Sequence, residues 1–137
     1  MLSVHKNCIT RFRDKIRKLN KKMRGSDIES SIKLMLPLIR GWVNYFGIAE
    51  TKDLFKGLDG WIRRKIRAIL WRQWKTPRTR FKRLKALDLG EASARRTAYA
   101  KCGPWRIARS PGIHKALSNS YIESLGYISM ESLVARL

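Results

Sequence analysis

The sequence predicts an all-α protein, with a three-helix bundle followed by a smaller helical unit. Apolar residues recur every three or four positions through most of the chain, which is the period of a helix with one buried face. Glycine and proline stand between these stretches, where helices end and begin. With 44% hydrophobic residues, a chain of 137 residues can bury a modest core.

The first helix is predicted over residues 9–24, because cations surround a regular apolar stripe and Gly25 then supplies a stop signal. Ser26 and Glu29, three residues apart, have the form of a capping box that opens the next helix. The stripe of the first helix consists of Ile9, Phe12, Ile16, Leu19 and Met23.

The second helix is expected from about Asp27 to Gly47, and its wide apolar face predicts a central position. Pro37 removes one internal hydrogen bond and should kink this helix without ending it, since the pattern resumes afterwards. Residues 47–51 are predicted to form a loop. A third helix should then run from about Lys52 to Trp74.

Helical projection of the third helix places Trp71 and Trp74 among cations, away from the main apolar stripe. Two interpretations stay open. The rings could stack on unpaired bases or sugar faces, or they could form a seam against which the following unit packs. Trp42 and Trp61, by contrast, lie at or beside apolar stripes and are expected in the core.

A second unit is predicted to begin at Thr76 and Pro77, which have the form of an N-cap followed by proline at the first helical position. An alanine-rich helix should follow over residues 91–101. Residues 102–112, which include two glycines and two prolines, are expected to be irregular, and a last helix is expected over residues 113–125. Ser129 could cap a final turn or two.

The charge of the chain is strongly positive and unevenly distributed. It contains 31 Lys and Arg against 10 Asp and Glu, a formal net charge of +21. Residues 113–137 hold two cations and two acids, so the whole excess lies in residues 1–112. Such an excess repels itself in a folded protein, and a polyanion that binds the folded form relieves that repulsion. Nucleic acid is therefore the expected partner.

The candidate RNA-binding residues lie around the end of the third helix and the start of the next. Any one of these cations could simply line a solvated helix face. As a group they almost lack compensating acids, which favours phosphate as the counter-charge. Trp105, in a Gly-Pro loop, is either a loop anchor or an RNA contact. The candidates are Arg63, Arg64, Arg67, Trp71, Trp74, Lys75, Arg78, Arg80, Lys82 and Arg83.

No motif for catalysis or metal binding stands out, and we expect no cofactor. The acids are mostly isolated, with no Asp-Asp pair to hold Mg²⁺. Cys8 and Cys102 are too scattered for a zinc site, and we expect reduced thiols more than a disulfide. The sequence has no apolar run long enough for a membrane span and no signal peptide, which predicts a cytoplasmic protein, with an organellar matrix as the minor alternative.

Three sequence words in order resemble the maturase-specific region of group II intron reverse transcriptases. They are Gly41-Trp42-Val43-Asn44-Tyr45-Phe46, Leu58-Asp59-Gly60-Trp61-Ile62-Arg63-Arg64 with Arg67, and Gln73-Trp74-Lys75. Gly103 to Trp105 and Ala116 to Asn119 extend the resemblance, which covers most of the chain.

The resemblance implies a thumb-like helical bundle over residues 1–75 and a small helical maturase domain over residues 76–137. In that family these parts bind intron RNA and stabilise its active fold for splicing, and the RNA performs the chemistry. The fingers and palm with their Tyr-x-Asp-Asp motif, and the optional endonuclease, are not in this sequence, so no polymerase activity is expected. In a full-length parent, the partners would include a DNA target or an RNA/DNA duplex. For this chain, a separate polymerase half would be a further partner.

Two other functions compete with the RNA-binding interpretation. One is a basic helical DNA-binding module that reads base edges from a recognition helix. The other is an inactive remnant of a truncated group II intron reverse transcriptase. Under the RNA-binding interpretation, Arg64→Ala should weaken binding broadly and lower the salt dependence by about one unit of slope.

Overall fold

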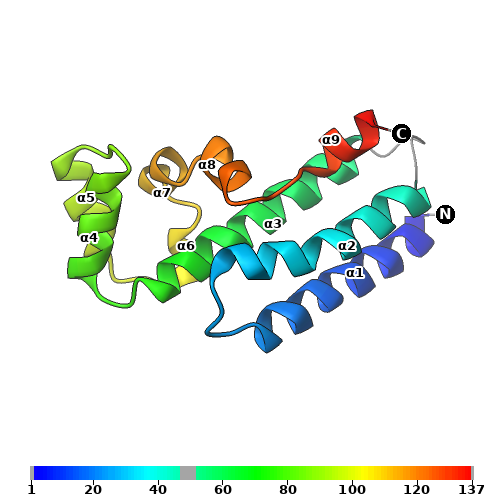
Figure 1. The fold of residues 1–137 in the computed structure, drawn as a ribbon, viewed down its shortest axis with the longest axis horizontal. Helices are drawn as coiled ribbons and strands as arrows, with labels where there is room; N and C mark the ends of the chain where they lie inside the picture. The colour runs from blue at the N-terminus through cyan, green and yellow to red at the C-terminus, as the bar shows by residue number, and fades with distance from the viewer. Residues whose placement is uncertain (1, 47–51, 137) are drawn as a thin grey trace. The chain divides into compact units, whose positions relative to one another are not determined.

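The computed structural model describes residues 2–46 and 52–136, which contain nine helices and no strand (Figure 1). The all-α prediction is confirmed, and the predicted loop over residues 47–51 lies outside the described residues. The long helices are α1 (Leu2–Lys22), α2 (Ile28–Phe46) and α3 (Lys52–Gln73). The shorter ones are α4 (Pro77–Ala86), α5 (Glu91–Ala98), α6 (Pro104–Ile107), α7 (Pro111–Ala116), α8 (Asn119–Ser124) and α9 (Met130–Ala135).

The chain divides into two compact units, each with its own internal packing. One unit comprises Met1–Lys56 with Gly126–Leu137, and the other comprises Gly57–Leu125. The predicted domains, 1–75 and 76–137, do not coincide with these units, because α3 contributes to both and the last segment belongs with the N-terminal helices. As a functional division, the boundary at residue 75 stays a prediction.

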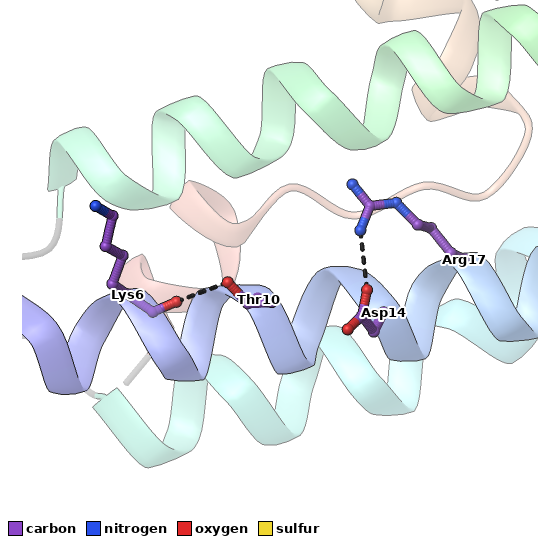
Figure 2. Close-up of polar contacts among 4 residues, drawn as sticks. All are labelled: Lys6, Thr10, Asp14 and Arg17. Atoms are coloured by element: carbon purple, nitrogen blue, oxygen red, sulfur yellow. Dashed lines mark hydrogen bonds and ion pairs between the residues drawn. The ribbon is translucent and has the colours of Figure 1, made fainter.

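In the first unit, α2 packs against both α1 and α9 (Figure 1). The apolar stripe of α2 is buried at every third or fourth position, as its wide face predicted. Phe12 and Ile16 of α1 are buried as well. The other face of α1 carries polar contacts within the helix: the Thr10 hydroxyl donates to the Lys6 carbonyl at 3.0 Å, and Arg17 pairs with Asp14 at 3.0 Å (Figure 2).

The start of α2 differs from the predicted capping box. Asp27 takes the capping role, because its carboxylate accepts from the backbone N–H of Ser30 at 3.3 Å and from the Ser30 hydroxyl at 2.7 Å. These hydrogen bonds stabilise the ionised carboxylate and lower the pKa of Asp27. Asp is as good an N-cap residue as Ser, so composition alone does not choose between Ser26 and Asp27. Gly25 has φ +93°, the left-handed conformation expected after a helix end.

In the second unit, α4 packs against α5, and α5 packs against α7. The predicted cap of α4 is confirmed, since Thr76 accepts from the backbone N–H of Thr79 at 3.3 Å and Pro77 is at the first helical position. Gly112 is needed where α7 meets α5, because a Cβ there would clash with the Thr97 side chain.

The predicted irregular segment over residues 102–112 is wrong in part, because two short helices begin there. Pro104 starts α6 and Pro111 starts α7, each at a first helical position where a missing N–H costs nothing. Ser110 caps α7 by accepting from Ile113 N–H at 3.4 Å. The alanine-rich helix also ends earlier than expected, at Ala98.

The predicted last helix over residues 113–125 is interrupted in the structure. Helix α7 ends at Ala116, and Ser118 caps α8 by accepting from Tyr121 N–H at 3.2 Å. The carbonyl of Leu117 instead accepts from the Nε of Arg67 at 2.7 Å. A side chain from α3 thus satisfies the backbone group that a continuous helix would have used. Ser129 caps α9, as predicted.

Candidate functional site

A stretch of sequence without acids covers the second half of α3 and all of α4, and its exposed and half-exposed cations form what we call the acid-free surface. Residues 60–87 contain eleven Lys and Arg and no Asp or Glu. The nearest ion pair on α4 joins Lys85 to Glu91 of α5 at 3.7 Å, and both side chains are about half exposed or more. Such an exposed pair contributes little to stability. This concentration of positive charge lacks compensation within the segment and suits a polyanionic ligand.

Four of the ten candidate residues are fully available to a ligand. Lys75, Arg78, Lys82 and Arg83 are exposed. Lys75 lies in the turn between α3 and α4 with φ +49°, a left-handed conformation that is uncommon for a residue with a side chain. The turn is held by a hydrogen bond from Thr76 N–H to the Trp74 carbonyl at 2.6 Å. This geometry fixes the backbone from which the exposed cations project.

Arg67 is not available to a ligand in this structure. It is 3% exposed, and its guanidinium donates to the Leu117 carbonyl at 2.7 Å and to the Asn119 side-chain oxygen at 2.9 Å. Desolvation is the main cause that lowers the pKa of Arg67, and the nearby charge of Arg63 adds to it. Its role is to join α3 to the α7–α8 connection, so we do not include it among the proposed RNA contacts.

Trp71 and Trp74 are also buried, at 1% and 8% exposure. Their ring centroids lie 6.0 Å apart, and the guanidinium of Arg80 lies 4.7 Å above the Trp71 ring. Arg80 also donates from its Nε to the Trp71 carbonyl at 3.1 Å. Of the two interpretations left open by the sequence, these contacts favour the seam, because both rings are buried and Arg80 of α4 covers Trp71. The rings have no open face for stacking on bases.

Arg64 and Trp105 form a second stacked pair. The Arg64 guanidinium lies 3.8 Å from the ring centroid, and its Nε donates to the Trp105 carbonyl at 2.9 Å. Trp105 keeps 40% of its surface exposed. Burial lowers the pKa of Arg64, and the positive charge of Arg109 lowers it further. Two arginines are therefore close together beside a part-exposed indole ring, an arrangement that favours an anion.

The sequence did not predict several cations that the fold brings near the rings of Trp61, Trp105 and Phe81. Lys65 lies 5.2 Å from the Trp61 ring and 5.8 Å from the Trp105 ring. On α4 and α5, Lys85 and Arg95 both lie over the Phe81 ring, at 5.5 and 5.2 Å. The only sequence signal for Lys65 is its position in the Arg63–Arg67 run. Nothing in the sequence indicates that Phe81 gathers cations from two helices.

The remaining observations concern chemistry. Among the described residues, no three His, Cys, Asp or Glu side chains come together in a group that could hold a metal ion. Cys8 and Cys102 are half-buried and free. No described helix combines the length and the apolar character that crossing a membrane requires.

The family of the chain follows from a comparison with known protein families. The profile of the group II intron, maturase-specific domain matches residues 9–87, which is more than half of the chain and runs through the predicted boundary at residue 75. No curated protein matches the chain significantly. The matched segment includes α3 and α4, and so contains the acid-free surface described above. The chain belongs to the group II intron maturase-specific domain family.

Proposed function

We propose that the chain binds group II intron RNA and assists its folding and splicing, with the RNA supplying the chemistry and the chain having no catalytic centre of its own. The observation that carries this proposal is the acid-free surface over residues 60–87, in a segment that matches the maturase-specific family. The exposed and half-exposed cations of this segment can provide the counter-charge for several phosphates.

The proposed contacts are six of the exposed and half-exposed cations of that surface. Arg63 and Arg64 are half-buried on α3, and the rest are exposed on the turn and on α4. Arginine can bind a phosphate through two donors at once, which fixes orientation as well as charge. Because the proposed contacts are all cations, we expect recognition by RNA shape, through phosphates and 2′-hydroxyls. The proposed contact residues are Arg63, Arg64, Lys75, Arg78, Lys82 and Arg83.

The test is a self-splicing assay near physiological Mg²⁺, with and without the protein. The wild-type protein should accelerate splicing, and the triple variant Arg78→Ala, Lys82→Ala, Arg83→Ala should lose most of that acceleration. A matched control removes three exposed cations elsewhere, Lys33→Ala, Arg40→Ala and Arg136→Ala. It should retain most of the wild-type acceleration.

Two results would contradict the proposal. If a folded wild-type sample fails to accelerate splicing, the function reduces to RNA binding at most, which is what an inactive remnant would show. If duplex DNA competes equally with the structured intron RNA at matched salt, the chain is better described as a basic DNA-binding module.

A further inference from the structure

A groove between α1 and α2, in the first unit, has a volume of about 370 Å³, which lies within the range of small-ligand sites. The acid-free surface of the second unit does not include it. Its walls combine aromatic rings, cations and one glycine. The rings are Phe12, Trp42 and Tyr45, the cations are Arg11 and Lys15, and the glycine is Gly41.

The aromatic wall is held in place by the core of the unit. The Trp42 ring centroid lies 5.1 Å from that of Phe12 and 4.4 Å from that of Phe46, so packing on both helices restrains the half-buried indole. Tyr45, in contrast, is 80% exposed, and it meets the Phe46 ring edge-on at 4.9 Å. A restrained ring beside an exposed one provides a surface on which a planar base can stack.

Gly41 has no structural explanation within the fold. It lies in the interior of α2, where glycine is less stabilising than alanine, and an added Cβ would meet no atom within 4 Å. Helix packing therefore does not require glycine at this position. Gly41 lines the groove together with Arg11, Lys15 and Trp42, and its missing side chain leaves that space open.

The charge of the groove is positive. Arg11 and Lys15 are exposed and one helical turn apart on α1, and no acid is among the lining residues. The nearest acid along α1, Asp14, is paired with Arg17 at 3.0 Å (Figure 2). The two cations can therefore share one phosphate, at the edge of an aromatic wall.

We propose that this groove holds one unpaired nucleotide of a single strand, with its base against Trp42 and Tyr45 and its phosphate between Arg11 and Lys15. The inference rests on the proposed function in that it takes RNA as the polyanion bound by the chain. A duplex is the poorer occupant, because its bases are already stacked on one another and have no free face for Trp42 or Tyr45. The groove would anchor a loop or bulge of the RNA whose phosphates the second unit binds.

The experiment uses the full chain and a short single-stranded RNA containing one 2-aminopurine, whose fluorescence falls when the base stacks. Wild-type protein should quench the probe. Gly41→Leu fills the groove with a good helix-forming residue and should reduce affinity for the probe about fivefold or more, with an unchanged or higher melting temperature. The double variant Arg11→Ala, Lys15→Ala should also reduce affinity about fivefold or more. A charge-matched control, Lys6→Ala with Lys33→Ala, should bind the probe and quench its fluorescence about as well as wild type does.

Binding of intron RNA measured in parallel separates this inference from the proposed function. Quenching that survives Gly41→Leu and the Arg11, Lys15 double variant overturns the groove, even if intron RNA still binds. Displacement of the probe by an acidic peptide as readily as by unlabelled single strand also overturns it, in favour of a protein partner. Groove-dependent quenching in a protein that does not promote splicing supports the groove and counts against the proposed function.

Discussion

The Nε of Arg67 donates to the carbonyl of Leu117, fifty residues further along the chain, at 2.7 Å. This bond falls where α7 has ended and α8 has not yet begun. Arg67 therefore fixes the position of the α7–α8 connection on α3. A cation that looks like a surface contact in the sequence acts as an internal support of the fold.

Replacing Arg67 should destabilise the second unit more than replacing an exposed cation. Arg67→Met keeps the stem but removes the donors, leaving the Leu117 carbonyl without its partner in a buried place. We expect a loss of about 2–3 kcal/mol in the free energy of unfolding. Urea denaturation measures it, with Arg72→Met as control, since Arg72 is exposed in the same helix. Equal losses in both variants would contradict the supporting role of Arg67.

Arg80 and Arg78, two residues apart on α4, should separate stability from binding. Arg80 stacks on Trp71 and donates to its carbonyl, so Arg80→Ala should lower the free energy of unfolding by about 1–2 kcal/mol. Arg78 is exposed, so Arg78→Ala should leave stability within about 0.5 kcal/mol and weaken RNA binding. Denaturation and filter binding on both variants test this. A stability loss in Arg78→Ala alone would reverse the assignment.

A local signal was enough to predict the start of α4, but the same signal was missed for α6 and α7. Thr76 with Pro77 predicts the start of α4, and the same logic applies to Pro104 and Pro111, which begin α6 and α7. Their neighbouring glycines favoured an irregular segment instead. The break after Ala116 depends on Arg67, a distant side chain, and no local pattern encodes it.

The sequence predicted the charge of the candidate site, but it did not predict which of its residues are exposed. The order of residues in the sequence is enough to locate a run of cations without acids. Helical projection placed Trp71 and Trp74 on a cationic face, but in the structure both rings are buried and Arg80 of α4 lies over Trp71. An arginine that supports the fold and one that awaits a ligand have the same sequence signature, since both lie on a helix among other cations.

Gly112→Ala should destabilise the contact between α5 and α7. The new methyl group would clash with the Thr97 side chain, which is itself buried, so the two helices would have to separate or Thr97 would have to shift. We expect a loss of about 1–3 kcal/mol, measured by thermal denaturation. Gly103→Ala is the matched control because a Cβ there meets nothing within 4 Å. Similar melting temperatures for the two variants would show that α5 and α7 are not tightly packed.

His114 should make stability depend on pH, with stability lost as pH falls through the unfolded-state pKa of about 6.5. Partial desolvation lowers the pKa of this exposed histidine and the charge of Arg67 adds to the effect, so the unfolded chain, with a pKa near 6.5, binds this proton more readily than the folded chain. The free energy of unfolding should therefore fall as pH decreases through about 6.5, and level off below the folded pKa. Urea midpoints at several pH values test this. The difference in urea midpoint between wild type and His114→Gln must change with pH. A difference that stays constant would contradict the role of His114.

Arg64 and Arg83 should affect the salt dependence of RNA binding alike but stability differently. Each proposed phosphate contact contributes about 0.7–0.9 to the slope of log affinity against log salt, so either alanine variant should lower that slope by about 1. Arg83 is exposed and its loss should not change stability. Arg64 also stacks on Trp105 and donates to its carbonyl, so Arg64→Ala should lose about 1 kcal/mol of unfolding free energy as well. Binding isotherms at four salt concentrations, with denaturation of the free protein, measure both quantities. An unchanged slope in Arg64→Ala together with the stability loss would mean that its guanidinium serves the Trp105 loop and makes no contact with phosphate.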